Sequence, residues 1–425
     1  MKQALYRSNS LCSRLRWLAA GLALCLAAAC GGGGGASESA PAAANAPADA
    51  PINDPVNTGN PVDTPAVAPP ANQAAEASAP ATPQQQTAIP VGISLTQRNL
   101  GVVLDLATDA QGNTIAVLLA GRPVARKFAP DGSPVAYGPD GQGLTLPGQG
   151  PTANLSPATL YTGAAFAGSG EAYVSNITTK GVGINAIGAT GGSISRISTG
   201  GEVTVLANWP AESAGAVAPA SVTLGPDGAL YFVDYLSGHL MKWTAQAGAS
   251  SVADVQAFPN GLVYEPRAFW IAVESANRIH VLGRSALSAG GSLLKRIDGR
   301  TVSVLAGNTD GGPNVDGTGA AAAFSPPVGF TLSPSGLALG SGGNVYVADG
   351  LVVRKVSPDG VVTTVAGQRG INVLATGPLP GSLGTLGAMT IGADGVIHVM
   401  TDAQGSSPLL LEKSQVKSLA KIRLE

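Results

Sequence analysis

The sequence predicts an all-β domain folded as a six-bladed β-propeller. From Val91 onward, short runs rich in Val, Ile, Leu and Thr alternate with Gly- and Asp-rich turns, as in sheet proteins. No long stretch of this region has helical periodicity. A pattern of four such runs recurs six times in tandem, and tandem four-stranded sheets are typical of a propeller.

The repeat is clearest in Val328–Gly367, which we interpret as four strands separated by a Gly turn and a Pro-Asp-Gly turn. Two columns of residues align the six units. The turn between the first and second strands is marked by Gly112, Gly170, Gly228, Asn277, Gly343 and Gly395. In the third strand a basic residue directly precedes an apolar one, at Lys127, Arg196, Lys242, Arg296, Lys355 and Lys421. Only 20 basic residues follow Val91, so six in one column support the alignment.

The alignment also predicts how the ring closes. It makes Ser418–Glu425 the third strand of the sixth unit, which then lacks a fourth strand of its own. The segment Ile89–Gln97 has strand character and precedes the first unit. We expect this segment to pair with Ser418–Glu425, because an unclosed ring would leave an exposed strand edge.

Two segments around the fifth unit resemble the NHL repeat. They are VADGLVVRKVSPDGVVTTVAG, Val347–Gly367, and DGTGAAAAFSPPVGFTLSPSG, Asp316–Gly336, where that family has DG-x-G-x-x-A-x-F-x-x-P-x-G. The resemblance implies a propeller of NHL type. It implies no single activity, because NHL-like propellers include protein-binding scaffolds, RNA binders and enzymes.

The first 29 residues predict a secretory signal peptide. Lys2, Arg7, Arg14 and Arg16 form a basic start, and the short apolar run Trp17–Ala29 follows it. Small residues then precede Cys30, which resembles the cleavage site of bacterial lipoproteins and implies lipidation of Cys30. Gly31 rather than Asp follows, which in such lipoproteins implies passage to the outer membrane. An ordinary signal peptide cut near Ala29 is the alternative.

The mature chain is predicted to have two parts. Residues 30–88 are rich in Ala, Pro, Gly and Asn and contain no aromatic residue, so we expect a lipidated, disordered tether. Residues 89–425 form the propeller. From Val91 the chain has 20 basic and 21 acidic residues, so no basic surface points to nucleic acid as a partner.

A candidate ligand or metal rim comes from the ends of the predicted second strands. In propellers of this kind, ligand sites lie at the axial funnel, near these ends. Asn176, Asp234, Asp349 and Thr401 supply oxygens suited to a hard cation such as calcium, whereas Leu118 and Gly283 do not. The structural alternative is that Asp234 and Asp349 cap the turns that follow them. The sequence leaves the identity of any metal unknown.

The remaining chemistry gives little support for an enzyme. His280 and His398 share a column with Tyr173, Tyr231 and Tyr346, which favours a packing position with a polar tip. A zinc site would need a denser group of histidines. No Gly-x-Ser-x-Gly motif is present. We therefore expect neither a catalytic residue nor a cofactor, with calcium as the alternative.

The functional hypothesis is a lipoprotein anchored in the outer membrane that faces the periplasm or the cell surface. Its propeller would be a non-enzymatic binding or scaffold module for an envelope protein or a saccharide. A partner surface is expected on the loops Ile177–Gly192, Arg284–Gly291 and Ala403–Lys417. One alternative is a calcium-dependent hydrolase of the lactonase type, a resemblance that implies a central metal near Asn176, Asp234 and Asp349. Another is an assembly factor for envelope proteins.

Overall fold

The computed structural model has the six-bladed β-propeller architecture expected from the sequence. It describes residues 91–97, 100, 103–120, 122–148, 158–179, 189–255, 269–284, 291–309, 313–325, 336–402 and 417–425. The predicted signal peptide, Cys30 and most of the region before the first strand lie outside these residues. The described part is nearly all strand, with the short 3₁₀ turns η2 (Gly319–Ala321) and η3 (Ser341–Gly343). It contains no helix long and apolar enough to cross a membrane.

The first three blades follow one another in chain order. Blade one contains β2 (Val103–Thr108), β3 (Thr114–Ala120), β4 (Arg122–Phe128), β5 (Pro134–Val135) and β6 (Leu144–Thr145). Blade two contains β7 (Ala158–Phe166), β8 (Ala172–Thr179), β9 (Ala189–Ile197) and β10 (Val203–Trp209). Blade three contains β11 (Pro219–Leu224), β12 (Leu230–Asp234), β13 (His239–Thr244) and β14 (Gly248–Asp254).

The last three blades complete the ring. Blade four contains β15 (Phe269–Ser275), β16 (Arg278–Arg284), β17 (Ser292–Asp298) and β18 (Thr301–Gly307). Blade five contains β20 (Gly336–Leu339), β21 (Val345–Asp349), β22 (Val352–Val356), β23 (Val361–Gly367) and the short edge strand β19 (Gly317–Thr318). Blade six contains β24 (Leu386–Ile391), β25 (Ile397–Asp402), β26 (Lys417–Arg423) and, from the other end of the domain, β1 (Gly92–Gln97).

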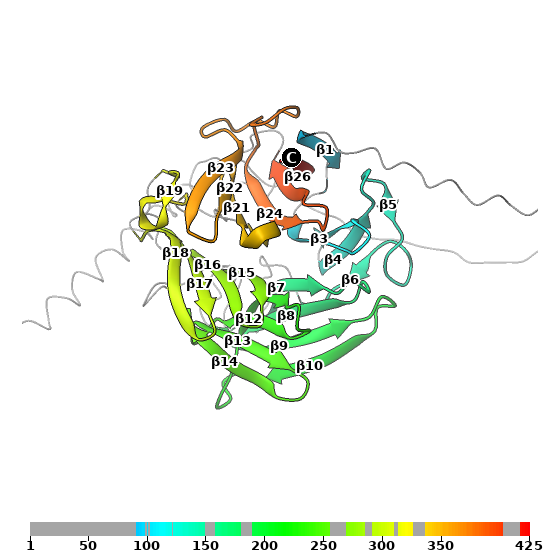
Figure 1. Ribbon diagram of the computed structural model, residues 1–425. Coiled ribbons are helices and arrows are strands. Elements are labelled where there is room, and N and C mark those ends of the chain that lie inside the picture. Colours follow the sequence, from blue (N-terminus) through cyan, green and yellow to red (C-terminus); the bar gives the residue numbers. More distant parts are fainter. Residues whose placement is uncertain are drawn as a thin grey trace, which may run out of the picture. The chain divides into compact units, whose positions relative to one another are not determined.

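The first strands of the blades surround a common axis. They contact one another in the order β2, β7, β11, β15, β20 and β24, and β24 contacts β2 again. Figure 1 shows the blades arranged around this axis. A cluster of buried apolar side chains lies at every one of the six blade interfaces. The apolar faces of the sheets are therefore buried against both neighbours, which is what holds the ring together.

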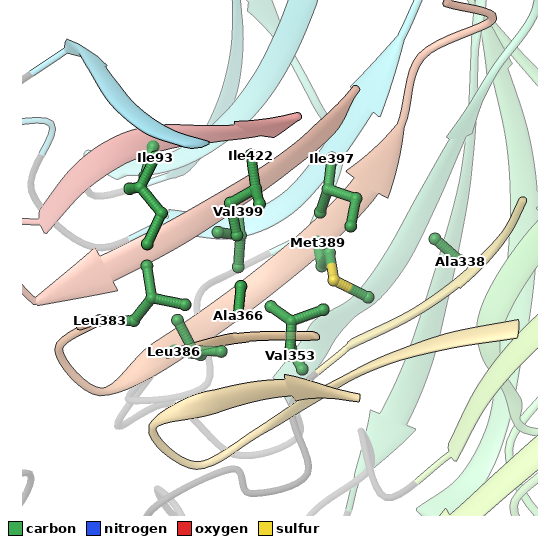
Figure 2. Close-up of a cluster of buried hydrophobic side chains, with 12 residues drawn as sticks. Ile93, Ala338, Val353, Ala366, Leu383, Leu386, Met389, Ile397, Val399 and Ile422 are labelled. Atoms are coloured by element: carbon green, nitrogen blue, oxygen red, sulfur yellow. The ribbon is translucent and has the colours of Figure 1, made fainter. Parts of the chain in front are cut away.

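Strand β1 closes the ring, as the sequence predicts. It pairs antiparallel with β26, with Ile93 opposite Ile422 and Ser94 opposite Lys421. On its other side, the Ile93 amide donates to the Gly377 carbonyl at 2.8 Å. Figure 2 shows Ile93 beside Ile422 and Leu383 in the cluster between blades five and six. The N-terminal segment is thus the fourth strand of blade six.

The basic column of the third strands and the Tyr/His column of the second strands are cross-strand partners. Arg196 lies opposite Tyr173, Lys242 opposite Tyr231, and Lys421 opposite His398. In blade three, Lys242 and Tyr231 both contact the Asp227 carboxylate at 2.8 Å. In this blade the basic residue of the third strand is therefore bound to a carboxylate of the turn between the first two strands.

One predicted loop is shorter than the sequence suggested. Strand β8 continues to Thr179 and β9 begins at Ala189, so the ends of Ile177–Gly192 are paired strand. Ile177 and Ala189 are buried in an apolar cluster with Leu160 and Ala218. The expectation that all of Ile177–Gly192 is loop is wrong, because apolar burial extends the hairpin. The parts of the three predicted partner loops at 180–188, 285–290 and 403–416 lie outside the described residues.

Candidate functional site: the central channel

The six first strands enclose a central channel with a volume of about 300 Å³. Every blade contributes to its wall, from Leu104–Thr108 in blade one to Ala388–Ile391 in blade six. Because the wall is built from strands packed on both sides, its side chains are held in place by the blade interfaces. Rigid strands position a binding site more accurately than loops do.

Small residues keep this channel open. Its wall includes Ala107, Ala164 and Ala388, together with glycines at positions 163 and 336. Gly336 also permits close packing, since a Cβ there would lie 2.9 Å from the Met389 Cβ of blade six. A larger residue at position 336 would force the two blades apart.

Asp105 is the only charged residue among the described residues that line the channel. Its Oδ2 atom accepts a hydrogen bond from the Tyr161 hydroxyl at 3.0 Å and another from the Ala164 amide at 3.2 Å. Both donors belong to β7 of the next blade. The carboxylate is therefore held at the wall by blade two, although it belongs to blade one.

Threonine hydroxyls in the wall connect neighbouring first strands. Thr108 Oγ1 donates to the Ile391 carbonyl at 3.1 Å, and Thr223 Oγ1 donates to the Ile271 carbonyl at 3.3 Å. A hydroxyl that donates its proton in this way keeps acceptor lone pairs. These oxygens are available to a ligand that can donate hydrogen bonds.

Large apolar residues lie at one end of the channel. Four first strands end in a large, partly exposed apolar residue at the side of the turns to the second strands: Phe166, Leu224, Leu339 and Ile391. Asp105, Ser221 and Trp270 lie nearer the starts of their strands. Ser221 has a φ of 56°, a left-handed backbone that a non-glycine residue adopts only where the surroundings hold it. It lies between Ala220 and Thr223, where the strand register shifts.

The four rim residues proposed from the sequence lie elsewhere. Three of them occupy equivalent places in their blades, each opposite a residue near the start of the first strand. Asn176 pairs with Tyr161, Asp234 with Pro219, and Thr401 with Leu386. However, Asn176, Asp234, Asp349 and Thr401 are all buried, and none is among the residues that line the channel. Each lies in a different blade.

Asp234 makes hydrogen bonds typical of a turn cap. Its Oδ1 accepts from the Ala218 amide at 2.9 Å and from the Leu236 amide at 3.2 Å. Its Oδ2 accepts from the Ser237 hydroxyl at 2.5 Å. These bonds fit the structural alternative, in which Asp234 fixes the turn after β12 and the start of β11.

Asn176 and Thr401 retain a buried polar atom without a hydrogen-bond partner. These atoms are Asn176 Oδ1 and Thr401 Oγ1. Gly148 packs directly against Asn176 Oδ1, because a Cβ atom at position 148 would lie 2.2 Å from that oxygen. Within the described part of the chain, no group of three or more His, Cys, Asp or Glu side chains is arranged to hold a metal ion.

Comparison with known proteins agrees with this architecture. Residues 202–391 match the family described as Teneurin NHL domain, from the fourth strand of blade two to the first strand of blade six. The domain is an NHL-type β-propeller. No curated protein matches the sequence.

Solved structures share the NHL-type propeller's fold at low sequence identity. A protein of unknown function from Bacteroides thetaiotaomicron is 15% identical, with a TM-score of 0.52, over 78% of this chain and 75% of that one. An auxiliary nutrient binding protein from the same organism is 13% identical, with a TM-score of 0.50, over 76% and 70%. One from Bacteroides ovatus is 12% identical, with a TM-score of 0.50, over 78% and 77%.

Residues of the NHL-like motif form a network in blade five that is buried at Arg354 and Asp349 and reaches the surface at Asp316. Arg354 is fully buried and donates to Asp349 Oδ2 at 2.9 Å and to Asp316 Oδ1 at 2.8 Å. Asp349 Oδ1 also accepts from the Ser325 amide at 2.8 Å. Burial raises the pKa of the Asp349 carboxyl, against the opposing effect of Arg354. Asp349 thus attaches the Asp316–Ser325 segment to the blade.

Sequence reasoning missed the residues of the channel itself. It aligned the ends of the second strands, whereas the wall consists of first strands. One signal was present in the NHL-type repeat: Asp105 interrupts an otherwise apolar first strand between Leu104 and Leu106. A carboxylate at such a position in the innermost strand must face the axis or be buried in a blade interface.

Proposed function

We propose that this protein is an exported, lipid-anchored binding module that holds a saccharide in its central channel without transforming it. The observation that carries the proposal is the channel itself. Its volume of about 300 Å³ lies at the lower end of the range for small-molecule sites, which suits a monosaccharide. The sequence left two ligand classes open, a saccharide and an envelope protein. Of these two, the volume of the channel suits the saccharide.

The chemistry of the wall supports a sugar. Threonine oxygens and the Asp105 carboxylate can accept hydrogen bonds from sugar hydroxyls. Trp270 supplies an aromatic surface on the same wall. Two solved structures with the same fold are described as auxiliary nutrient binding proteins, which is consistent with a binding role.

Blocking the channel tests the proposal. Ala107→Leu adds bulk to the wall and should weaken saccharide binding roughly tenfold or more, because the new side chain occupies ligand volume. Ala211→Leu makes the same change at an exposed position and should bind like the wild type. The measurement is calorimetric titration of the purified full chain with a monosaccharide panel. Equal loss in both variants, or no loss in either, would contradict the proposal.

The anchor is a separate part of the proposal. The basic start, the short apolar run and the small residues before Cys30 support lipidation at that cysteine. Cys30→Ser should abolish metabolic labelling with palmitate and release the protein from the membrane fraction, since stable anchoring depends on more than one acyl chain. Membrane retention without label would count against the anchor and leave the channel proposal intact.

A further inference from the structure

We propose that the saccharide held in the channel carries an apolar aglycone, so that the ligand class is an alkyl or aryl glycoside. The inference rests on the proposed saccharide function and adds the chemistry of the group attached to the sugar. It comes from a set of large apolar side chains at one end of the channel, which we call the apolar collar. The members of the collar are Phe166, Leu224, Leu339 and Ile391.

The collar residues lie at one height of the channel. Each is the last residue of its first strand and pairs with the first residue of its second strand. Thr108 occupies the same place in blade one, and its hydroxyl donates to the Ile391 carbonyl of the collar. All of these residues line the same channel. The collar is therefore a single level of the wall, built from four blades.

The level directly inside the collar has small side chains. There the six blades contribute four alanines and two threonines: Ala107, Ala165, Thr223, Ala272, Ala338 and Thr390. Together with the collar, this level makes a largely apolar section about 7 Å deep, at about 3.3 Å per residue. The small inner level leaves room for a group that enters this section from the rest of the channel.

Each collar side chain is held by the blade interface behind it. Phe166 packs against the cluster between blades one and two, and Leu224 packs against the cluster between blades two and three. Leu339 and Ile391 do the same at the interfaces of blades five and six with the blades that precede them. All four nevertheless remain partly exposed. Covering this apolar surface would favour binding, because it removes the surface from water.

The channel is narrow enough for one ligand to contact several blades. Its lining takes about four residues from a typical first strand, which span about 13 Å. A volume of about 300 Å³ over that length corresponds to a mean diameter of roughly 5 Å. A group on the axis at the height of the collar is therefore within reach of side chains from opposite blades.

A free monosaccharide would leave the collar uncovered. Sugar hydroxyls need hydrogen-bond partners when they are buried, and the four collar side chains offer none. An apolar group on the same molecule suits the collar, because both apolar surfaces then leave water. The sugar itself would occupy the rest of the channel, beyond the level of small side chains.

Methyl and hexyl glycosides of one sugar are matched probes, because they differ only in the length of the alkyl chain. The wild-type full chain is titrated by calorimetry with the methyl and hexyl β-glycosides of glucose and of galactose, at concentrations where the hexyl compounds are monomeric. The hexyl glycoside should bind at least about tenfold more tightly than its methyl counterpart. Each fully buried methylene contributes up to about fourfold in affinity, so partial burial of the chain is sufficient.

Substitutions in the collar test where the alkyl chain lies. Leu339→Asn places a polar side chain of similar size in the collar and should reduce the hexyl preference to about threefold or less. Binding of the methyl glycoside should change little. Leu339→Met keeps the collar apolar and should retain the preference. Leu236→Asn makes the polar change at an exposed position outside the channel and should also retain it. If Leu339→Asn fails to fold, Leu224→Asn makes the same test in blade three.

The outcomes separate this inference from the function on which it rests. Equal affinity of the wild type for methyl and hexyl glycosides, or a hexyl preference that survives in Leu339→Asn and Leu224→Asn, overturns the collar inference alone. Failure of both glycosides to bind overturns it too, and failure of every monosaccharide in the panel also overturns the saccharide function. Hexanol that binds as tightly as the hexyl glycosides would keep the collar as an apolar site and overturn the saccharide function.

Discussion

At the scale of single residues, His398 makes the stability of the propeller depend on pH. It is buried, and its Nδ1 lies 2.7 Å from the Thr114 hydroxyl of the neighbouring blade. Burial, reinforced by nearby Lys421, lowers the pKa of His398 from 6.5 to about 4. As the pH falls between these two values, the unfolded chain takes up a proton that the folded chain does not bind. Stability contributed by this group is therefore lost toward acid pH.

The expected size of this effect is about 3 kcal/mol between neutral pH and pH 4, at about 1.4 kcal/mol for each pKa unit. His398→Gln removes the titrating group and keeps a side chain that can hydrogen-bond Thr114. Urea denaturation at about pH 7 and about pH 4 should show a smaller acid loss in the variant. Identical acid losses in both proteins would rule out His398 as the cause.

Residue roles were predictable from the sequence where the repeat constrained them. The alternation of Tyr and His at positions 231, 280, 346 and 398 indicated a packing column, and both described histidines in it are buried. Asp234 and Asp349 were identified as special positions, but two interpretations were open. Only the hydrogen bonds to the Ala218 and Ser325 amides distinguish a turn cap or loop attachment from a free ligand rim.

At the scale of elements, β1 should be essential to the stability of the whole ring. The Ile93 amide faces Gly377, so the amide of Ser94 faces the opposite way, toward β26. Ser94→Pro should remove a ladder hydrogen bond and lower the melting temperature, whereas Ser94→Thr keeps the amide and should melt like the wild type.

Truncation tests the same element as a whole. A chain that begins at Leu100 loses the ladder with β26 and the buried side chain of Ile93, which should cost roughly 3 kcal/mol or more. A chain that begins at Thr87 keeps β1 and should be unaffected. Calorimetric melting curves compare the two. If both melt at the full-length temperature, β1 does not close the ring in solution.

Elements were predictable because the blades repeat. The basic column placed β26 as a third strand, and that placement left one strand position for Ile89–Gln97. The ends of strands were harder to predict from the sequence. Strands β8 and β9 are longer than expected because Ile177 and Ala189 pack against Leu160 and Ala218. Leu160 lies in β7 of the same blade and Ala218 directly precedes β11 of the next one. Contacts of this kind depend on the tertiary fold and cannot be inferred from local alternation.

At the scale of the whole molecule, the same contacts hold the ring together and form the channel. The contacts that join each first strand to the next, including Thr108 with Ile391 and Thr223 with Ile271, also form the channel wall. The sequence predicted the ring from its repeats. It did not predict the residues of the channel wall. Bulges such as the one at Ser221 decide which side chains of a first strand face the axis.

The most direct test of the central claim is amide hydrogen exchange of the full chain with and without a saturating concentration of the monosaccharide that binds most tightly in the calorimetric panel. If the ligand binds in the channel, added protection should be greatest in the first strands, including β2, β7 and β11, from several blades at once. The outer strands β10, β14 and β18 should change little, because they lie at the far edge of their sheets. Protection confined to one blade, or to outer strands while β2 and β7 stay unchanged, would contradict a ligand site on the axis.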